Sequence, residues 1–240
     1  MERSRDFYVR ITGDYALFKS SYSKGSGESV SNMLASRQAL QGIVDNLYWK
    51  HTLSNVVTEL KVINMIQTEV IGTRALLSNM KADLNYVSYL TNVEYLIKFH
   101  FIWNENRPDL VKDRNMKKHE AIMQRSIDRG GRRDIFLGTR ECVGLAESIT
   151  KYEYENSKSF YDNQILPLGI MFHSFEYPKK SGEPLKSYYT DTVMKNGIVR
   201  FKEQAECEIM NTLSNYTFKL PGEIKAVENE LAEYEQMDRR

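Results

Sequence analysis

Three consecutive residues, Lys117, Lys118 and His119, carry groups that could act on a phosphodiester. Histidine exchanges a proton near neutral pH, and lysine can neutralise phosphate charge. The three residues stand where a basic helix should begin, and a helix N-terminus presents free backbone N–H groups to an anion. Together they indicate a site for phosphodiester chemistry.

Tyr48 could complete this set with a hydroxyl group. Metal-independent cleavage of RNA uses the ribose 2′-hydroxyl as nucleophile, so the protein must supply a base, an acid and positive charge for the phosphorane. His119, Tyr48 and Lys118 are chemically sufficient for these roles, and DNA, which lacks the hydroxyl, would only be bound. Each residue also has a purely structural interpretation, because a histidine beside lysines is often a surface residue and Tyr48 could simply end a helix.

Histidine, cysteine and acidic residues show no spacing typical of metal ligands. The cysteines form no CxxC pair, and no pair of acidic residues indicates a two-metal nuclease. The sequence also lacks the glycine-rich phosphate loop, the dinucleotide fingerprint and the nucleophile elbow. We therefore expect no metal and no organic cofactor.

Basic residues are concentrated in the middle of the chain. The formal net charge is only +1 over 240 residues, but residues 107–133 contain nine Lys or Arg against four Asp or Glu. Such a patch can contact phosphates, although a solvated helix face explains many charge runs equally well. From charge and position, the candidates for RNA binding are Lys24, Arg125, Arg129, Arg132 and Arg133.

The composition is that of a folded soluble protein, with 41% apolar and 27% charged residues. Two isolated cysteines fit a reducing cytoplasm. The N-terminus lacks the apolar stretch of a signal peptide, and the longest uncharged run, residues 163–175, is shorter than the ~20 residues of a membrane helix. We expect a cytoplasmic protein that does not span a membrane.

Residue spacing predicts the elements that position these groups. The predicted strands cover residues 6–18, 56–63, 95–102 and 133–142, with a further extended stretch at 70–77, and the predicted helices cover 36–49 and 116–129. This order, strand, helix, strand, strand, helix, strand, is that of an α+β, ferredoxin-like (RRM-like) domain, a fold that many unrelated functions use. We expect this domain to span residues 1–145.

Residues 146–240 are predicted to form a smaller β-rich domain. A short polar helix at 147–160 should precede strands at 168–177, 186–194 and 198–202. Asn196 and Gly197 join the last two strands and are a strong hairpin signal. Residues 223–237 should close the chain as an acidic helix.

Several blocks, in this order along the chain, resemble the CRISPR-associated repeat-processing endoribonuclease of type I-C systems, which belongs to the repeat-associated mysterious protein superfamily. The blocks are residues 14–18, 37–43, 48–50, 118–120, 130–140 and 169–172. The resemblance therefore covers essentially the whole chain. It implies the same architecture, a ferredoxin-like domain with a smaller β-rich C-terminal part.

The resemblance also implies a function. The protein would bind the hairpin of a CRISPR repeat, cleave at its 3′ base without metal and leave a 2′,3′-cyclic phosphate. It would then stay on the guide-RNA 5′ handle beside the other subunits of the type I-C interference complex. The family's catalytic residues fall on Tyr48, Lys118 and His119, and Lys117 or His51 could share a role. Binding of double-stranded DNA is left open, and the alternative function is a non-catalytic subunit that holds the 5′ handle.

Overall fold

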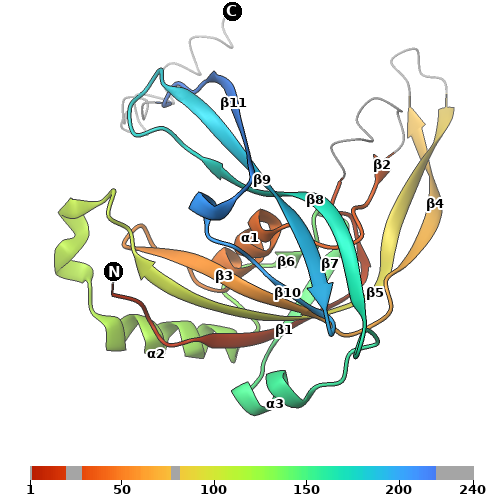
Figure 1. The fold of residues 1–240 in the computed structure, drawn as a ribbon, viewed down its shortest axis with the longest axis horizontal. Helices are drawn as coiled ribbons and strands as arrows, with labels where there is room; N and C mark the ends of the chain where they lie inside the picture. Colours follow the sequence, from red (N-terminus) through yellow and green to blue (C-terminus); the bar gives the residue numbers. More distant parts are fainter. Residues whose placement is uncertain (1, 20–28, 77–81, 220–240) are drawn as a thin grey trace, which may run out of the picture.

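A computed structural model of the protein describes residues 2–19, 29–76 and 82–219. Lys24 and the predicted acidic helix at 223–237 lie outside the described residues. The rest forms a mixed α/β structure with few helices, in which a mostly antiparallel sheet of eleven strands connects almost all elements (Figure 1).

The strands are β1 (Phe7–Ala16), β2 (Ser29–Val30), β3 (Leu53–Val62), β4 (Gln67–Leu76), β5 (Ala82–Trp103), β6 (Ile135–Phe136), β7 (Val143–Ser148), β8 (Ile165–Glu176), β9 (Pro184–Lys195), β10 (Ile198–Arg200) and β11 (Ile209–Asn215). The helices are α1 (Arg37–Leu47), α2 (Met116–Ile127) and α3 (Lys151–Asn156), with 3-10 turns η2 (Pro108–Asp113) and η3 (Gln204–Glu206).

The centre of the sheet runs in the order β3-β5-β1-β7, and each neighbouring pair is antiparallel. Alternate residues of these strands face the core, as in β1, where Phe7, Val9 and Ile11 are buried. Val9 lies opposite Ile97 of β5, so both contribute to the same layer of side chains. This alternation confirms the predicted strands at 6–18, 56–63 and 95–102.

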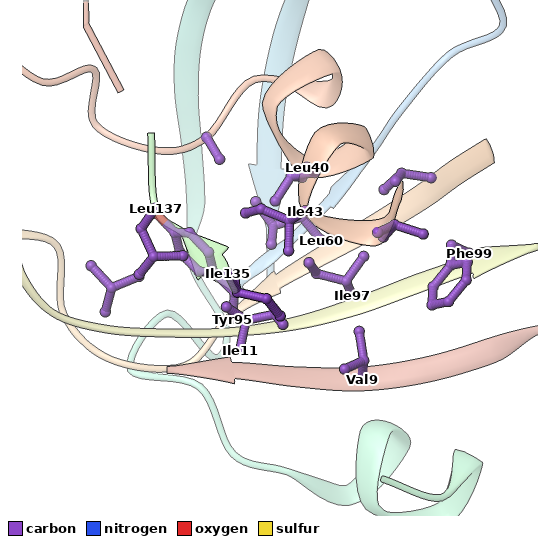
Figure 2. Packing of buried hydrophobic residues seen from close by; sticks show 14 of the residues in the cluster. Val9, Ile11, Leu40, Ile43, Leu60, Tyr95, Ile97, Phe99, Ile135 and Leu137 are labelled. Atoms are coloured by element: carbon purple, nitrogen blue, oxygen red, sulfur yellow. The ribbon is translucent and has the colours of Figure 1, made fainter. Parts of the chain in front are cut away.

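Helix α1 covers this layer with one apolar face. Ser36 caps its N-terminus, and the Ser36 Oγ accepts a hydrogen bond from the Ala39 N–H, as the sequence predicts. Figure 2 shows Leu40 and Ile43 of α1 packed over Leu60 and Ile97 of the sheet. Met123 and Ile127 of α2 join the same core, so the ends of both helices are fixed relative to the sheet.

The predicted strand at residues 133–142 is wrong. Only Ile135 and Phe136 form a strand there, because the chain turns back at Gly138, and the N–H of Leu137 donates to the carbonyl of Cys142. The strand that pairs with β1 is β7, which begins at Val143. The polar helix predicted at 147–160 is correspondingly shorter, since Thr150 caps α3 and starts it at Lys151.

The sheet continues across the predicted domain boundary. Strand β7 spans residue 145, and β10 pairs with β3. The division into 1–145 and 146–240 stays a prediction about folding units. In the second part, Asn196 and Gly197 both have positive φ (52° and 73°) and confirm the predicted hairpin. Strand β11 was not predicted, because its largely exposed sequence has no alternating apolar pattern.

Gly138 sits where a side chain cannot be accommodated. Its φ is +97°, and an added Cβ would lie 2.0 Å from the Leu17 carbonyl oxygen. Gly169 has a similar φ of +72° but open space around it. We expect Gly169→Ala to cost about 1–2 kcal/mol of unfolding free energy from backbone strain alone. Gly138→Ala should cost about 2–5 kcal/mol, because overpacking is added to the strain. Denaturant unfolding of both variants measures the difference, and equal losses would contradict this account.

No helix in the described part of the chain is long and apolar enough to cross a membrane.

Candidate functional site

Two of the three predicted catalytic residues are in direct contact. Tyr48 is the residue that ends α1, and His119 lies in the first turns of α2. The Tyr48 Oη is 2.8 Å from the His119 Nδ1, and both side chains are fully buried. From the sequence alone, His119 could have been a surface residue. The burial of its side chain excludes that interpretation.

The hydrogen bonds of His119 determine which atoms carry protons when its ring is neutral. The Nε2 atom is 2.9 Å from the backbone carbonyl of Asp113, which can only accept, so Nε2 carries the proton. The Nδ1 atom must then accept a hydrogen bond from the Tyr48 hydroxyl. Burial raises the pKa of Tyr48, which keeps this hydroxyl protonated at neutral pH.

Asp113 connects Lys118 to this pair. Its carboxylate accepts hydrogen bonds from the Lys118 ammonium and, at 2.8 Å, from the Thr52 hydroxyl. Its Oδ2 also lies 3.4 Å from the His119 Nε2. The hydrogen bond from Lys118 is the main reason why the pKa of Asp113 falls to about 2. Asp113 is therefore ionised at neutral pH, and its carboxylate lies between the Lys118 ammonium and the imidazole ring of His119.

Sequence reasoning did not identify Asp113 and Thr52. Asp113 lies in the polar segment before α2, where no periodic pattern marks it, and the η2 turn folds it back toward Lys118. Thr52 comes from the loop before β3 and meets Asp113 only in the folded chain. The one available signal was an acidic residue a few positions before a basic helix start.

Lys118 and its neighbour Lys117 lie in the same turn of α2 but make different contacts. Asn115 caps the helix by accepting from the Lys118 N–H at 3.0 Å, and the Lys118 side chain turns to Asp113. Lys117 is exposed and forms no ion pair within residues 2–19, 29–76 and 82–219. His51 is also exposed, and its ring packs against Trp49.

Arg132 lies over one member of the buried pair, Tyr48. Its guanidinium carbon is 4.6 Å from the centre of the Tyr48 ring, a cation–π contact. Gly130 and Gly131, with φ of +80° and +106°, turn the chain after α2 toward the end of α1. There the N–H groups of Arg132 and Arg133 both donate to the carbonyl of Asn46 at 3.2 Å.

The other candidate RNA-binding residues surround this loop at the surface. Arg125 lies on α2, Arg129 follows it, and Arg133 follows Arg132; all three are exposed. None of them pairs with an acidic side chain among the residues that the structure describes. Lys24, the fifth candidate, lies outside that part of the chain.

The burial of Tyr48 and His119 has a chemical consequence. Neither side chain is accessible to a substrate in this arrangement, so a reaction here requires residues packed around the pair, such as Arg132 over the Tyr48 ring, to move aside. Within the described ranges, no group of three His, Cys, Asp or Glu side chains could hold a metal ion.

Comparisons with known proteins assign this chain to a family. A family model described as CRISPR-associated protein (Cas_Cas5) matches residues 8–202. A solved structure of a CRISPR-associated protein is 56% identical, has a TM-score of 0.77, and the match covers 88% of this chain and 99% of that chain. A functionally uncharacterized protein from Streptococcus mutans is 57% identical, with a TM-score of 0.77 and coverage of 88% and 100%. No curated protein gives a significant match.

Proposed function

The chain belongs to the CRISPR-associated Cas5 family, in its type I-C (Cas5d) branch, and from this premise we propose that it is a metal-independent endoribonuclease that processes CRISPR precursor RNA. It would cleave at the 3′ base of the repeat hairpin. The observation that carries this proposal is the hydrogen bond of 2.8 Å between Tyr48 and His119, with Lys118 held next to His119 by Asp113.

The hydrogen bonding supports a definite path for the protons. As the 2′-oxygen forms its bond to phosphorus, its proton passes to the Tyr48 Oη, and Tyr48 gives its own proton to the His119 Nδ1. Asp113 stabilises the resulting imidazolium. Lys118 neutralises the phosphorane and protonates the departing 5′-oxygen. The products are a 2′,3′-cyclic phosphate and a free 5′-hydroxyl.

RNA itself would open the site. A phosphate offers Arg132 two charge-assisted hydrogen bonds, which are stronger than its contact with the Tyr48 ring. A second phosphate can compete with Asp113 for Lys118. The reactive hydroxyl would therefore become accessible only when RNA lies on the basic loop formed by residues 129–133.

The strand order supports a finer assignment of the fold. We infer that β1, α1, β3, β5, α2 and β7 form a ferredoxin-like (RRM-like) unit, because the sheet order β7-β1-β5-β3 with antiparallel neighbours suits two interlocked βαβ units. Both helix ends that carry the candidate site, Tyr48 and His119, belong to this unit.

We expect Arg132→Gln to weaken binding of the repeat hairpin and to reduce the slope of log affinity against log salt by about one, as for the loss of one phosphate contact. Arg74→Gln, an exposed arginine on β4 far along the chain from this loop, is the matched control and should change neither. Fluorescence anisotropy over a salt series measures both values. Equal effects of the two substitutions would contradict a specific phosphate contact at Arg132.

We infer that, after cleavage, the protein stays on the 5′ handle of the guide RNA. There it would lie beside other subunits of the type I-C interference complex, in the cytoplasm of a prokaryote. The burial of Tyr48 and His119 favours a second candidate function, a non-catalytic subunit that only holds this handle.

One experiment separates the two functions. Purified protein is mixed, in excess chelator, with RNA that carries the repeat from the neighbouring CRISPR array. We expect one cut per repeat, at the 3′ base of the hairpin, with the handle fragment remaining bound to the protein. Tight binding without any cut would exclude the nuclease and leave the handle-binding subunit.

A further inference from the structure

A cavity of about 450 Å³ lies near the N-terminal end of α1. Its walls come from the start of α1, residues 17–19, the turn at Gly138 and Thr139, and strands β8 and β9. The candidate active site lies at the opposite end of α1, about 16 Å away for a helix of this length. The cavity is therefore separate from the Tyr48–His119 pair, and its volume is within the ~300–1,000 Å³ of small-molecule sites.

Three aromatic rings form one wall of this cavity. The Phe172 ring centre is 4.7 Å from that of Phe175 and 5.6 Å from that of Tyr189, and both contacts are tilted rather than parallel. Tilted packing leaves ring faces uncovered, and Phe175 is 38% exposed. Such faces can stack on a flat ligand.

The rest of the lining is mixed: Leu17, Phe18 and Ala39 are apolar, and the other side chains bring polar groups and one positive charge. Lys19 is exposed at the edge of the cavity, and Asn32 and Thr139 contribute an amide and a hydroxyl group. A wholly apolar peptide or lipid would offer no partner to the Asn32 amide or to the Lys19 ammonium at the cavity edge. A ligand with a flat ring, hydrogen-bonding edges and an attached phosphate would match the aromatic rings, the polar side chains and the lysine, respectively.

The aromatic wall continues along the surface as a row. Tyr177 follows Phe175, with 6.4 Å between ring centres, and contacts Tyr216 at 5.3 Å, which in turn contacts Phe218 at 6.1 Å. The last three rings are exposed, and the exposed Lys179 and Lys180 follow Tyr177 in the sequence. Aromatic rings combined with lysines are the usual surface for single-stranded nucleic acid, because every base can stack and every nucleotide carries a phosphate.

We propose that this cavity receives an unpaired base of single-stranded RNA, and that the row from Phe175 to Phe218 carries the neighbouring nucleotides. Phe172, Phe175 and Tyr189 stack on the inserted base, Asn32 contacts its polar edge, and Lys19 contacts its phosphate. This inference rests on the proposed function in one respect, that the chain handles repeat RNA. It adds a second binding site that recognises the unpaired part of the repeat.

The test is binding of a labelled single-stranded RNA taken from the part of the repeat outside its hairpin. A series of such RNAs has one nucleotide at a time replaced by an abasic residue. We expect one abasic position to weaken binding by roughly 5- to 150-fold, the effect of losing one stacked base. Phe175→Leu should weaken binding of the intact RNA similarly and remove the effect of that abasic position, because the two changes act on the same contact.

Phe160→Leu is the matched control, since Phe160 is an exposed phenylalanine (54%) outside the cavity and the row. It should bind all RNAs like the wild type. Phe172→Leu provides a second test within the wall, and thermal unfolding verifies that each variant is folded.

If each abasic position weakened binding equally in the wild type and in Phe175→Leu, the proposal would be overturned. The cavity would then be a candidate binding site for a protein segment instead. Absence of single-stranded RNA binding by the wild type would overturn it as well. These RNAs lack the hairpin and the cleavage site, so the result does not depend on the nuclease. If the wild type did not cut the repeat but still showed the loss of affinity at one abasic position, the proposed nuclease function would fail and the cavity proposal would stand.

Discussion

Replacing Tyr48 with phenylalanine is expected to slow cleavage of the repeat RNA by about 10²–10⁴-fold, the usual contribution of a general acid or base. The substitution removes only the hydroxyl that stands between the ribose and His119 in the proposed proton path. Hairpin affinity should remain close to that of the wild type, because the exposed arginines that would contact phosphate are unchanged. Single-turnover rates at saturating RNA, together with equilibrium binding, measure the two effects separately.

Loss of a buried hydroxyl also affects stability, so a matched control is required. Without Tyr48 Oη, the His119 Nδ1 has lost its partner, at a cost of about 1–3 kcal/mol. Tyr161→Phe removes a comparable hydroxyl, which accepts a hydrogen bond from the Ile66 N–H at 2.9 Å. We expect similar destabilisation in both variants but normal cleavage in Tyr161→Phe. If both variants lost cleavage equally, Tyr48 would have a structural role only.

Lys118→Met should lower the cleavage rate by about 10²–10³-fold, because removing one charged group from a developing negative charge has effects of this size. Methionine retains most of the side-chain volume and suits a helix, so the first turn of α2 should remain folded. The rate is again measured at saturating RNA, which separates catalysis from affinity.

The neighbouring lysine is the control for this substitution. Lys117→Met removes the same charge from the same helical turn, but the Lys117 side chain is exposed and forms no ion pair with Asp113. We expect its cleavage rate to stay near that of the wild type, with only a modest loss of affinity. A large loss of rate in Lys117→Met, or equal losses in both variants, would show that general positive charge, rather than the position of Lys118, matters.

Local sequence patterns were sufficient to predict the helices and strands that carry the candidate site. The spacing of Leu40, Ile43 and Leu47 and the cap at Ser36 predicted α1, and the alternation in residues 95–102 predicted the central strand. These features depend on neighbours within a few positions. The strand predicted at 133–142 failed because a close approach to Leu17, distant in sequence, requires the turn at Gly138.

The arrangement of the candidate site was only partly accessible from the sequence. His119 precedes Met123 by four residues and Ile127 by eight, a spacing that suits the buried face of α2, but its lysine neighbours left a surface position equally open in the sequence. The contact of Arg132 with the Tyr48 ring was not predictable, because it depends on how the loop after α2 packs against the end of α1. The same holds for Thr52, which reaches Asp113 across 61 residues of sequence.

The central claim is that the 2′-hydroxyl of the RNA is the nucleophile, activated by Tyr48 and His119 without a metal. The most direct measurement compares two repeat RNAs in excess chelator on a denaturing gel, one all-ribose and one with a single 2′-deoxy nucleotide at the 3′ base of the hairpin. We expect the first RNA to be cut at that position and the second to be bound with similar affinity but left intact. Cleavage of the deoxy RNA at the same position would contradict the account.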